Sequence, residues 1–170
     1  ILLKNNPFIL PSFSNDVHYE VEILVKINKV GKHIQTKFAH KYYEDIGLGI
    51  DFTARDVQNY LKEKGLPWEK AKGFDGAAVI GERWFSKSEF EDVNAIPFRL
   101  EKNKEIVQSG TTAEMLWKRD ELIAHVSKYL TLKIGDVLFT GTPHGVGPVV
   151  EGDQLEGYIK DQSCFSIHVK

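Results

Sequence analysis

The sequence is poor in several features that would each point to a particular class of protein. Its single cysteine, Cys164, has no partner for an internal disulfide. No apolar run reaches the roughly 20 residues that a membrane-spanning helix requires. The formal net charge of -2 lacks the positive excess that favours nucleic acids or acidic membrane surfaces. These absences predict a cytoplasmic protein with neither a nucleic-acid nor a membrane partner.

The residues that are present favour one folded domain. The chain has 170 residues, of which 42% are hydrophobic and 11% aromatic, enough to build one sizeable core and too many for a disordered chain. We therefore expect a single catalytic domain over residues 1–170. The chain begins at Ile1 rather than at methionine, and we expect a further segment upstream of it.

Alternation of apolar and polar residues predicts a strand over residues 18–27. The apolar members share one face: Tyr19, Val21, Ile23, Val25 and Ile27. The opposite face carries Glu20 and Glu22 together with His18, Leu24 and Lys26. We expect the apolar face to turn toward the core.

Strands outnumber helices in the rest of the chain, which predicts a strand-rich α+β domain. Further strands are expected at 47–52, 77–80, 96–100, 105–108, 137–140 and 164–169. Helices are expected at 37–43, from a capping box at 53–56 through Lys64 with Gly65 ending it, and at 119–129. The last helix has an apolar stripe: Leu122, Ile123, Val126 and Leu130.

Glu20 and Glu22 are the first candidate ligands for a hard cation. Side chains two apart on a strand share a face, with their bases roughly 6 to 7 Å apart, so two carboxylates can converge on one Mg²⁺-type ion. The alternative is a solvated strand face, which Lys26 supports and Leu24 opposes. Asp51 lies where a strand gives way to a helix, a place from which side chains often enter a site, although it also suits a simple turn.

Three other segments carry polar groups that suit an anionic substrate. Arg55 and Gln58 are three apart near a helix N-terminus, where they form either a carboxylate site or a surface pair. Lys72 precedes a glycine-flanked aromatic turn and presents an ammonium group to a pocket or caps a loop. The loop 140–148 offers hydroxyl and N–H groups to an oxyanion, without the Gly-Lys-Ser/Thr of a Walker phosphate loop.

These segments occur together in an order that resembles the fumarylacetoacetate hydrolase family, and within it the small acylpyruvate hydrolases and oxaloacetate decarboxylases. The matching stretches cover most of the chain: 18–22 (HYEVE), 51–58 (DFTARDVQ), 72–75 (KGFD), 110–115 (GTTAEM) and 130–147 (LTLKIGDVLFTGTPHGVG). The resemblance implies a mixed β-sheet roll of the family's C-terminal domain type, with a few short helices, in a homodimer.

The resemblance also implies roles for individual residues. Glu20, Glu22 and Asp51 fall on the family's metal ligands, for Mg²⁺ or Mn²⁺, with Ca²⁺ possible in crystals. Lys72 falls on the active-site lysine. The positions that hold metal waters or the oxo-acid end of the substrate correspond to Arg55, Gln58 and Thr142.

The implied activity is hydrolysis of a C–C bond in a small acylpyruvate-type 2-oxo acid, such as fumarylpyruvate or acetylpyruvate, through a metal-bound enolate. The alternatives are oxaloacetate decarboxylation, isomerisation of a hydroxyheptadienedioate-type 2-oxo diacid, and a non-catalytic metal-binding domain without its lid. No His-x-x-Glu segment precedes Glu20, so we expect the lid and its water-activating base upstream of Ile1. A second departure is Asn103-Lys104, where the family has a tight Asn-Gly turn.

Overall fold

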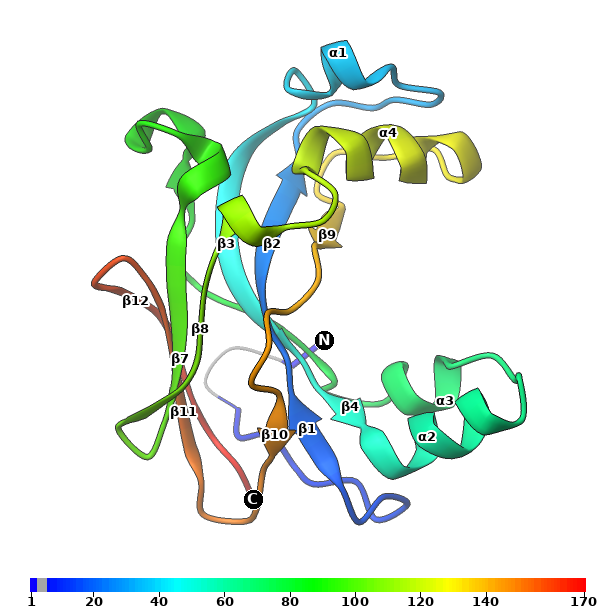
Figure 1. Ribbon diagram of the computed structural model, residues 1–170, viewed down its shortest axis with the longest axis vertical. Coiled ribbons are helices and arrows are strands. Elements are labelled where there is room, and N and C mark those ends of the chain that lie inside the picture. Colours follow the sequence, from blue (N-terminus) through cyan, green and yellow to red (C-terminus); the bar gives the residue numbers. More distant parts are fainter. Residues whose placement is uncertain (3–5) are drawn as a thin grey trace.

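The computed structural model describes residues 1–2 and 6–170 and confirms a strand-rich α+β fold. Figure 1 shows curved sheets running along the long axis, with helices gathered toward the two ends on one side. All pairings between named strands are antiparallel in the described part of the chain, and the parallel component is an isolated bridge between Phe8 and Val169.

The strands form three sheets. The central sheet has the order β5 (Ala78–Ile80), β3 (Tyr43–Asp51), β2 (Val21–Ile27) and β9 (Val137–Phe139), with β6 (Phe85–Ser86) also paired to β3. A second sheet has the order β12 (Gln162–His168), β11 (Gln154–Ile159), β7 (Pro97–Lys102) and β8 (Glu105–Thr111). A small third sheet has the order β10 (Gly147–Pro148), β1 (Val17–Tyr19) and β4 (Thr53–Ala54).

Short helices connect and cover these strands. They are α1 (Thr36–Ala39), α2 (Arg55–Glu63), α3 (Glu69–Lys72) and α4 (Arg119–Tyr129), with single 3₁₀ turns η1 (Lys87–Glu89), η2 (Val93–Ala95) and η3 (Thr112–Glu114). Figure 1 shows α1 and α4 together at one end, and α2 beside α3 toward the other. None of the helices in the described residues has both the length and the apolar character needed to span a bilayer.

The predicted strand over 18–27 is divided in the structure. β1 ends at Tyr19 and β2 begins at Val21, so the chain passes from the small sheet to the central sheet at Glu20. The predicted apolar face is buried, as Ile23 and Val25 show with 1% exposure each. The opposite face is buried at Glu20, Glu22 and Leu24 and partly exposed at its two ends, His18 and Lys26, so the glutamates are surrounded mainly by protein.

The helix predictions were right in place and partly wrong in detail. α4 has the predicted bounds, but its buried face includes Ile123, Ala124 and Ser127, while Leu130 is 63% exposed. The short helix predicted at 37–43 is instead α1, because Tyr43 already begins β3.

The capping box predicted for α2 is wrong. Ala54 is the N-cap, and Thr53 uses its hydroxyl to donate to the Asp51 carbonyl (3.3 Å) and to accept from Lys72 Nζ (2.6 Å). The predicted end of this helix is confirmed, since Gly65 has a φ of 64° just beyond it. Thr53 is therefore part of the polar site described below.

The turn between β7 and β8 places two residues other than glycine in the left-handed region. Asn103 has a φ of 54° and Lys104 a φ of 71°. Asn103 offsets its strain because its amide donates to Asp153 Oδ1 (2.8 Å) and accepts from the Gln154 N–H (2.9 Å). Lys104 is exposed, and a β-carbon in this conformation is unfavourable, so the departure from Asn-Gly costs stability.

Replacing Lys104 by glycine relieves this strain. We expect Lys104→Gly to raise the free energy of unfolding by about 0.5–1 kcal/mol, measured by urea denaturation. The matched control is Glu105→Gly, at the next exposed position, which lies in a strand and is expected to lower stability by a similar amount. Equal destabilisation by the two variants would contradict a strained turn.

Candidate metal centre

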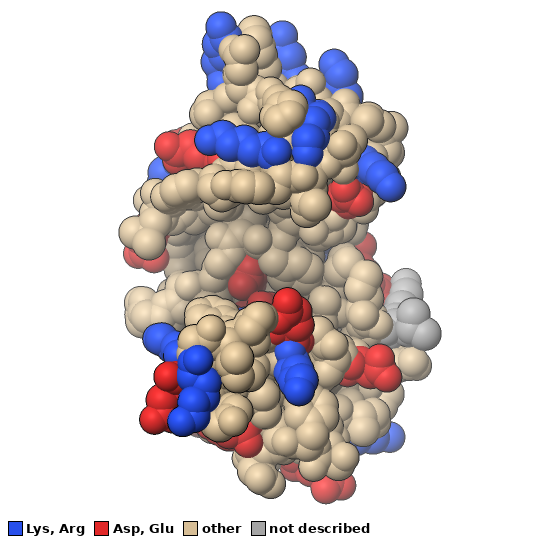
Figure 2. All heavy atoms as spheres, turned by 90° about the vertical axis from the view of Figure 1, so that its right-hand side faces the viewer, with Lys and Arg blue, Asp and Glu red and all other residues tan. Residues whose placement is uncertain are grey.

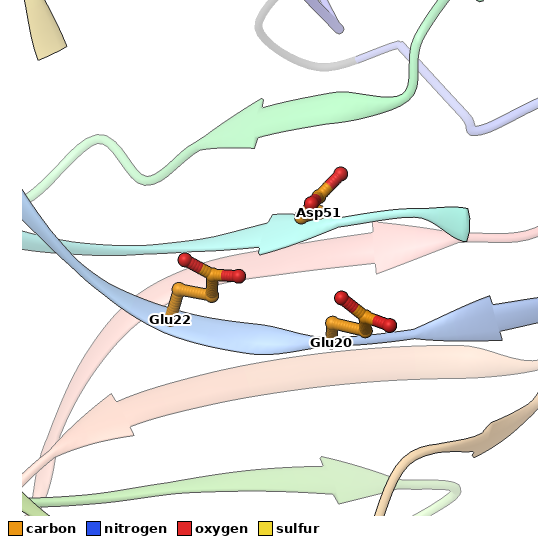
Figure 3. Close-up of side chains that lie close together, drawn as sticks. All are labelled: Glu20, Glu22 and Asp51. Atoms are coloured by element: carbon orange, nitrogen blue, oxygen red, sulfur yellow. The ribbon is translucent and has the colours of Figure 1, made fainter. Parts of the chain in front are cut away.

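Three carboxylates from two adjacent strand segments converge on one point. Asp51 ends β3, which pairs with β2, and its N–H donates to the carbonyl of Glu20 at 2.9 Å. Glu20, Glu22 and Asp51 each offer one oxygen such that all three lie within 4.8 Å of one another. Figure 3 shows the three carboxylates projecting from neighbouring strands to the same side. Glu20 is 8% and Glu22 5% exposed, so the solvated-face alternative is wrong.

Two cations neutralise part of this charge. Lys72 Nζ, at the end of α3, donates to Glu20 Oε2 at 2.8 Å and to Asp51 Oδ2 at 2.7 Å. Arg55, the first residue of α2, donates from Nη2 to Glu20 Oε1 and from Nη1 to Gln58 Oε1, the latter at 2.6 Å. The structure thus brings Lys72, Arg55 and Gln58 to the acidic cluster.

Glu22 is the carboxylate that Lys72 and Arg55 neutralise least, because their hydrogen bonds go to Glu20 and Asp51. Its pKa is raised to about 7, chiefly because the group is buried; the Gly141 N–H lowers the pKa, and the charges of Asp51 and Glu20 raise it. That N–H donates to Glu22 Oε2 at 2.6 Å. Gly141 has a φ of 95°, a conformation that favours glycine, so the residue type is part of this contact.

The other groups have pKa shifts that follow from their partners. Burial tends to raise the pKa of Glu20, but hydrogen bonds from Lys72 and Arg55 lower it overall. Burial raises the pKa of Asp51 despite its bond to Lys72. For Lys72, burial lowers the pKa, and the bonds to Asp51 and Glu20 outweigh it and raise the pKa. Lys72 is therefore held as an ammonium ion.

The donor set fits a hard divalent cation. All three groups are carboxylates, the ligands that Mg²⁺ and Mn²⁺ prefer, and together they carry more negative charge than Lys72 and Arg55 balance. A cation here would compete with Lys72 for the oxygens of Glu20 and Asp51. Glu20, Glu22 and Asp51 are the residues that would hold it.

The loop after β9 is fastened to the ligand-bearing strand. Thr140 donates its hydroxyl to the Ile23 carbonyl (2.8 Å), and Thr142 donates its hydroxyl to the Val21 carbonyl (2.9 Å). Because the Gly141 N–H is also committed, these three donors do not supply the oxyanion site that the sequence suggested. Thr142 instead lies in the wall of the site as a hydrogen-bond acceptor.

A cavity of about 440 Å³ adjoins this loop. Its lining includes Gly141, whose N–H reaches Glu22, and the apolar side chains of Phe98 and Met115. Figure 2 shows one side of the molecule hollowed between its two ends, with atoms of acidic residues in the hollow. The cavity thus adjoins the acidic cluster at Gly141, the residue that bonds Glu22.

Two residues that hydrogen-bond to the site were not among the predicted site residues. His18 accepts at Nδ1 from Arg55 Nε at 3.4 Å, which leaves Nε2 to donate to Asp16 Oδ1 at 2.9 Å. Gln108 bonds both Val21 and Thr142 from β8. The alternation on 18–27 placed His18 beside the glutamates, whereas no local signal marks Gln108, which is 87 residues from Val21.

Comparisons with known proteins identify relatives of this chain in sequence. The family model for "Fumarylacetoacetate (FAA) hydrolase C-terminal" matches residues 1–170. Mouse mitochondrial oxaloacetate tautomerase FAHD1 is 38% identical over 98% of this chain and 75% of its own. Escherichia coli oxaloacetate tautomerase YcgM is 42% identical, over 88% of this chain and 68% of its own.

A solved enzyme structure is similar to this chain in both sequence and fold. Fumarylpyruvate hydrolase from Pseudomonas aeruginosa, in complex with Mn²⁺ and pyruvate, has a TM-score of 0.89 and 32% identity, covering 96% of this chain and 70% of that one. It is a metal-binding enzyme structure with the same fold. The predicted fold class is therefore confirmed by both sequence and structure.

The raised pKa of Glu22 predicts that the metal-free protein loses folding stability as the pH rises. Below the ordinary value of 4.5, both folded and unfolded chains bind the proton, and this loss is absent. Between 4.5 and about 7 the unfolded chain ionises first, so the folded state loses stability as the pH rises. At pH 8 we expect Glu22→Gln to be more stable than the parent by up to about 3 kcal/mol, measured by urea denaturation with chelator.

The control for this measurement is Glu105→Gln, an exposed glutamate in β8, which is expected to change stability little at any pH. The Glu22→Gln and parent curves are expected to meet near pH 4. A Glu22→Gln variant that is less stable than the parent at pH 8 would contradict the conclusion that the ionised Glu22 carboxylate lowers the stability of the metal-free protein.

Proposed function

The chain belongs to the fumarylacetoacetate hydrolase family, and we propose that it is a divalent-metal enzyme that acts on a small 2-oxo acid through its enolate. The observation that carries the proposal is the convergence of Glu20, Glu22 and Asp51 with the Lys72 ammonium at one partly buried point. The metal that we propose is Mg²⁺ or Mn²⁺.

An enolate is common to the activities named for the similar proteins. Tautomerisation of oxaloacetate moves a proton from the carbon beside the carbonyl to the carbonyl oxygen and passes through the enolate. Hydrolysis of fumarylpyruvate breaks a C–C bond and leaves pyruvate as its enolate. Both reactions therefore benefit from positive charge at the developing oxyanion.

The side chains divide this work in our proposal. A bound divalent cation supplies Lewis acidity to the oxo group. Lys72 stays protonated and places its ammonium group beside the negative charge that develops during enolisation. Arg55, held by Glu20 and bonded to Gln58, directs a guanidinium group toward the carboxylate end of the substrate.

Tautomerisation of an oxaloacetate-type acid is the reaction that the described site supports best. It needs a base for the proton on carbon and positive charge beside the enolate, and Lys72 and the proposed metal would supply the positive charge. Similarity to two oxaloacetate tautomerases supports this choice. Hydrolysis of an acylpyruvate is the second candidate, supported by the likeness to a fumarylpyruvate hydrolase, and it requires an additional base to activate water.

Removing any one carboxylate tests the proposed metal centre. We expect Glu20→Gln, Glu22→Gln and Asp51→Asn each to weaken Mn²⁺ binding at least 100-fold, because a neutral amide leaves the other two ligands to hold the ion. Isothermal titration calorimetry measures the affinity. The exposed Glu105→Gln variant is the control, and parental affinity in the three site variants would refute the centre.

Lys72 is tested by separating turnover from metal binding. We expect Lys72→Met to lower kcat for oxaloacetate tautomerisation by about 100-fold or more, because the developing oxyanion loses its ammonium partner. Mn²⁺ affinity should be retained or increased, since Lys72 competes for oxygens of Glu20 and Asp51. Ultraviolet absorbance of the enol follows the reaction, and an unchanged kcat would remove Lys72 from the mechanism.

A further inference from the structure

Gln108 is a buried amide that joins three separate segments at the edge of the metal centre. It lies in β8 and is 1% exposed. Its Oε1 accepts from the Val21 N–H at 2.9 Å. Its Nε2 donates to Thr142 Oγ1 at 3.0 Å and to the Pro143 carbonyl at 3.1 Å. Both ends of the amide are thus occupied, and both of its N–H groups have a partner.

These bonds form a closed ring with the ligand-bearing strand. Val21 donates to Gln108, Gln108 donates to Thr142, and Thr142 donates back to the carbonyl of Val21 at 2.9 Å. Each hydrogen of the ring has one acceptor, so the direction of every bond is set. A buried polar network that is fully satisfied in this way is rigid, since any displacement leaves a buried group without its partner.

The ring includes one residue next to the proposed metal ligands and one residue next to a hydrogen-bond donor to Glu22. Val21 lies between Glu20 and Glu22, so a bond to its N–H fixes the backbone from which both carboxylates project. Thr142 follows Gly141, whose N–H donates to Glu22 Oε2. If the loop moved away from β2, Glu22 would lose this donor and its orientation.

We propose that Gln108 is a positioning residue for the metal centre, which sets the orientation of Glu22 by clamping the loop 140–143 to β2. The inference rests on the proposed function, because it concerns the alignment of metal ligands. Groups that orient metal ligands from outside the coordination sphere typically change metal affinity or activity by about 10- to 100-fold when they are removed.

The ring also defines what Thr142 offers to a substrate. Its single hydroxyl proton is donated to Val21, and one of its oxygen lone pairs accepts from Gln108. The remaining lone pair makes Thr142 an acceptor, suited to an O–H such as that of an enol or a water molecule, and unsuited to an oxyanion. Without Gln108, the hydroxyl loses the bond that fixes this orientation.

A purely structural role is the alternative, in which Gln108 only satisfies buried polar groups and contributes to stability. Ser127 provides a matched control for that role. It is 0% exposed, its Oγ accepts from the Ile34 N–H at 2.9 Å and donates to the Ala124 carbonyl at 3.0 Å, and it lies in α4 without a bond to the metal centre. Losing either clamp should destabilise the fold.

The experiment compares Gln108→Met and Ser127→Ala with the parent chain. Mn²⁺ affinity is measured by calorimetry, unfolding by urea, and kcat and KM with oxaloacetate. We expect Gln108→Met to weaken Mn²⁺ binding about 10- to 100-fold and to lower kcat at saturating Mn²⁺. We expect Ser127→Ala to lose stability with Mn²⁺ affinity and kcat unchanged.

A second variant carries the test if Gln108→Met does not fold. Gln108→Glu keeps the acceptor for the Val21 N–H and the size of the side chain, and replaces the donor to Thr142 and Pro143, so it frees the loop and should also weaken Mn²⁺ binding. Parental Mn²⁺ affinity and kcat in the folded Gln108 variant would overturn the positioning role. Absence of Mn²⁺ binding by the parent chain would instead refute the proposed function itself.

Discussion

The mutual repulsion of three carboxylates, two of them buried and Asp51 partly buried, is the interaction on which the rest of the site depends. Glu20, Glu22 and Asp51 bring oxygens within 4.8 Å of one another in a setting where burial already disfavours their charge. Lys72 and Arg55 relieve Glu20 and Asp51, and Glu22 retains a pKa raised to about 7. This arrangement lowers the stability of the metal-free protein. A divalent cation bound by the three carboxylates would neutralise their charge and remove that loss of stability.

The fold meets this constraint through the path of one strand and the pairing of its neighbour. The chain changes sheets at Glu20, so Glu20 and Glu22 project from the point where β1 gives way to β2. The antiparallel register of β2 and β3 then brings Asp51 beside them. From there the chain turns directly into α2, which delivers Arg55 and Gln58, so most of the polar site comes from two short stretches of sequence.

Much of this was predictable because local patterns report it. Alternation marked the buried face of β2, an apolar stripe marked α4, and the strand-to-helix position of Asp51 pointed to a site. The family resemblance supplied the roles of Lys72, Arg55 and Thr142, which spacing alone left open. The homodimer, the cytoplasmic location and the expected upstream lid remain predictions.

The failures arise where distant residues decide the structure. The Thr53 hydroxyl bonds Lys72 rather than capping α2. The strand β11 was not predicted, because Gly157 in its centre interrupts the strand pattern. Glycine is needed there because a β-carbon would lie 2.2 Å from the ring of Phe165, its partner on β12. Gln108 joins positions 87 and 34 residues away, which no local pattern encodes.

The central claim is that the three carboxylates bind one divalent cation in place of their bonds to Lys72. The most direct measurement is a crystal structure of the chain with Mn²⁺, using anomalous diffraction to locate the ion. Our account predicts a single strong peak in contact with Glu20, Glu22 and Asp51. A Lys72 ammonium still bridging Glu20 and Asp51 at saturating Mn²⁺, with no peak between the three carboxylates, would contradict it.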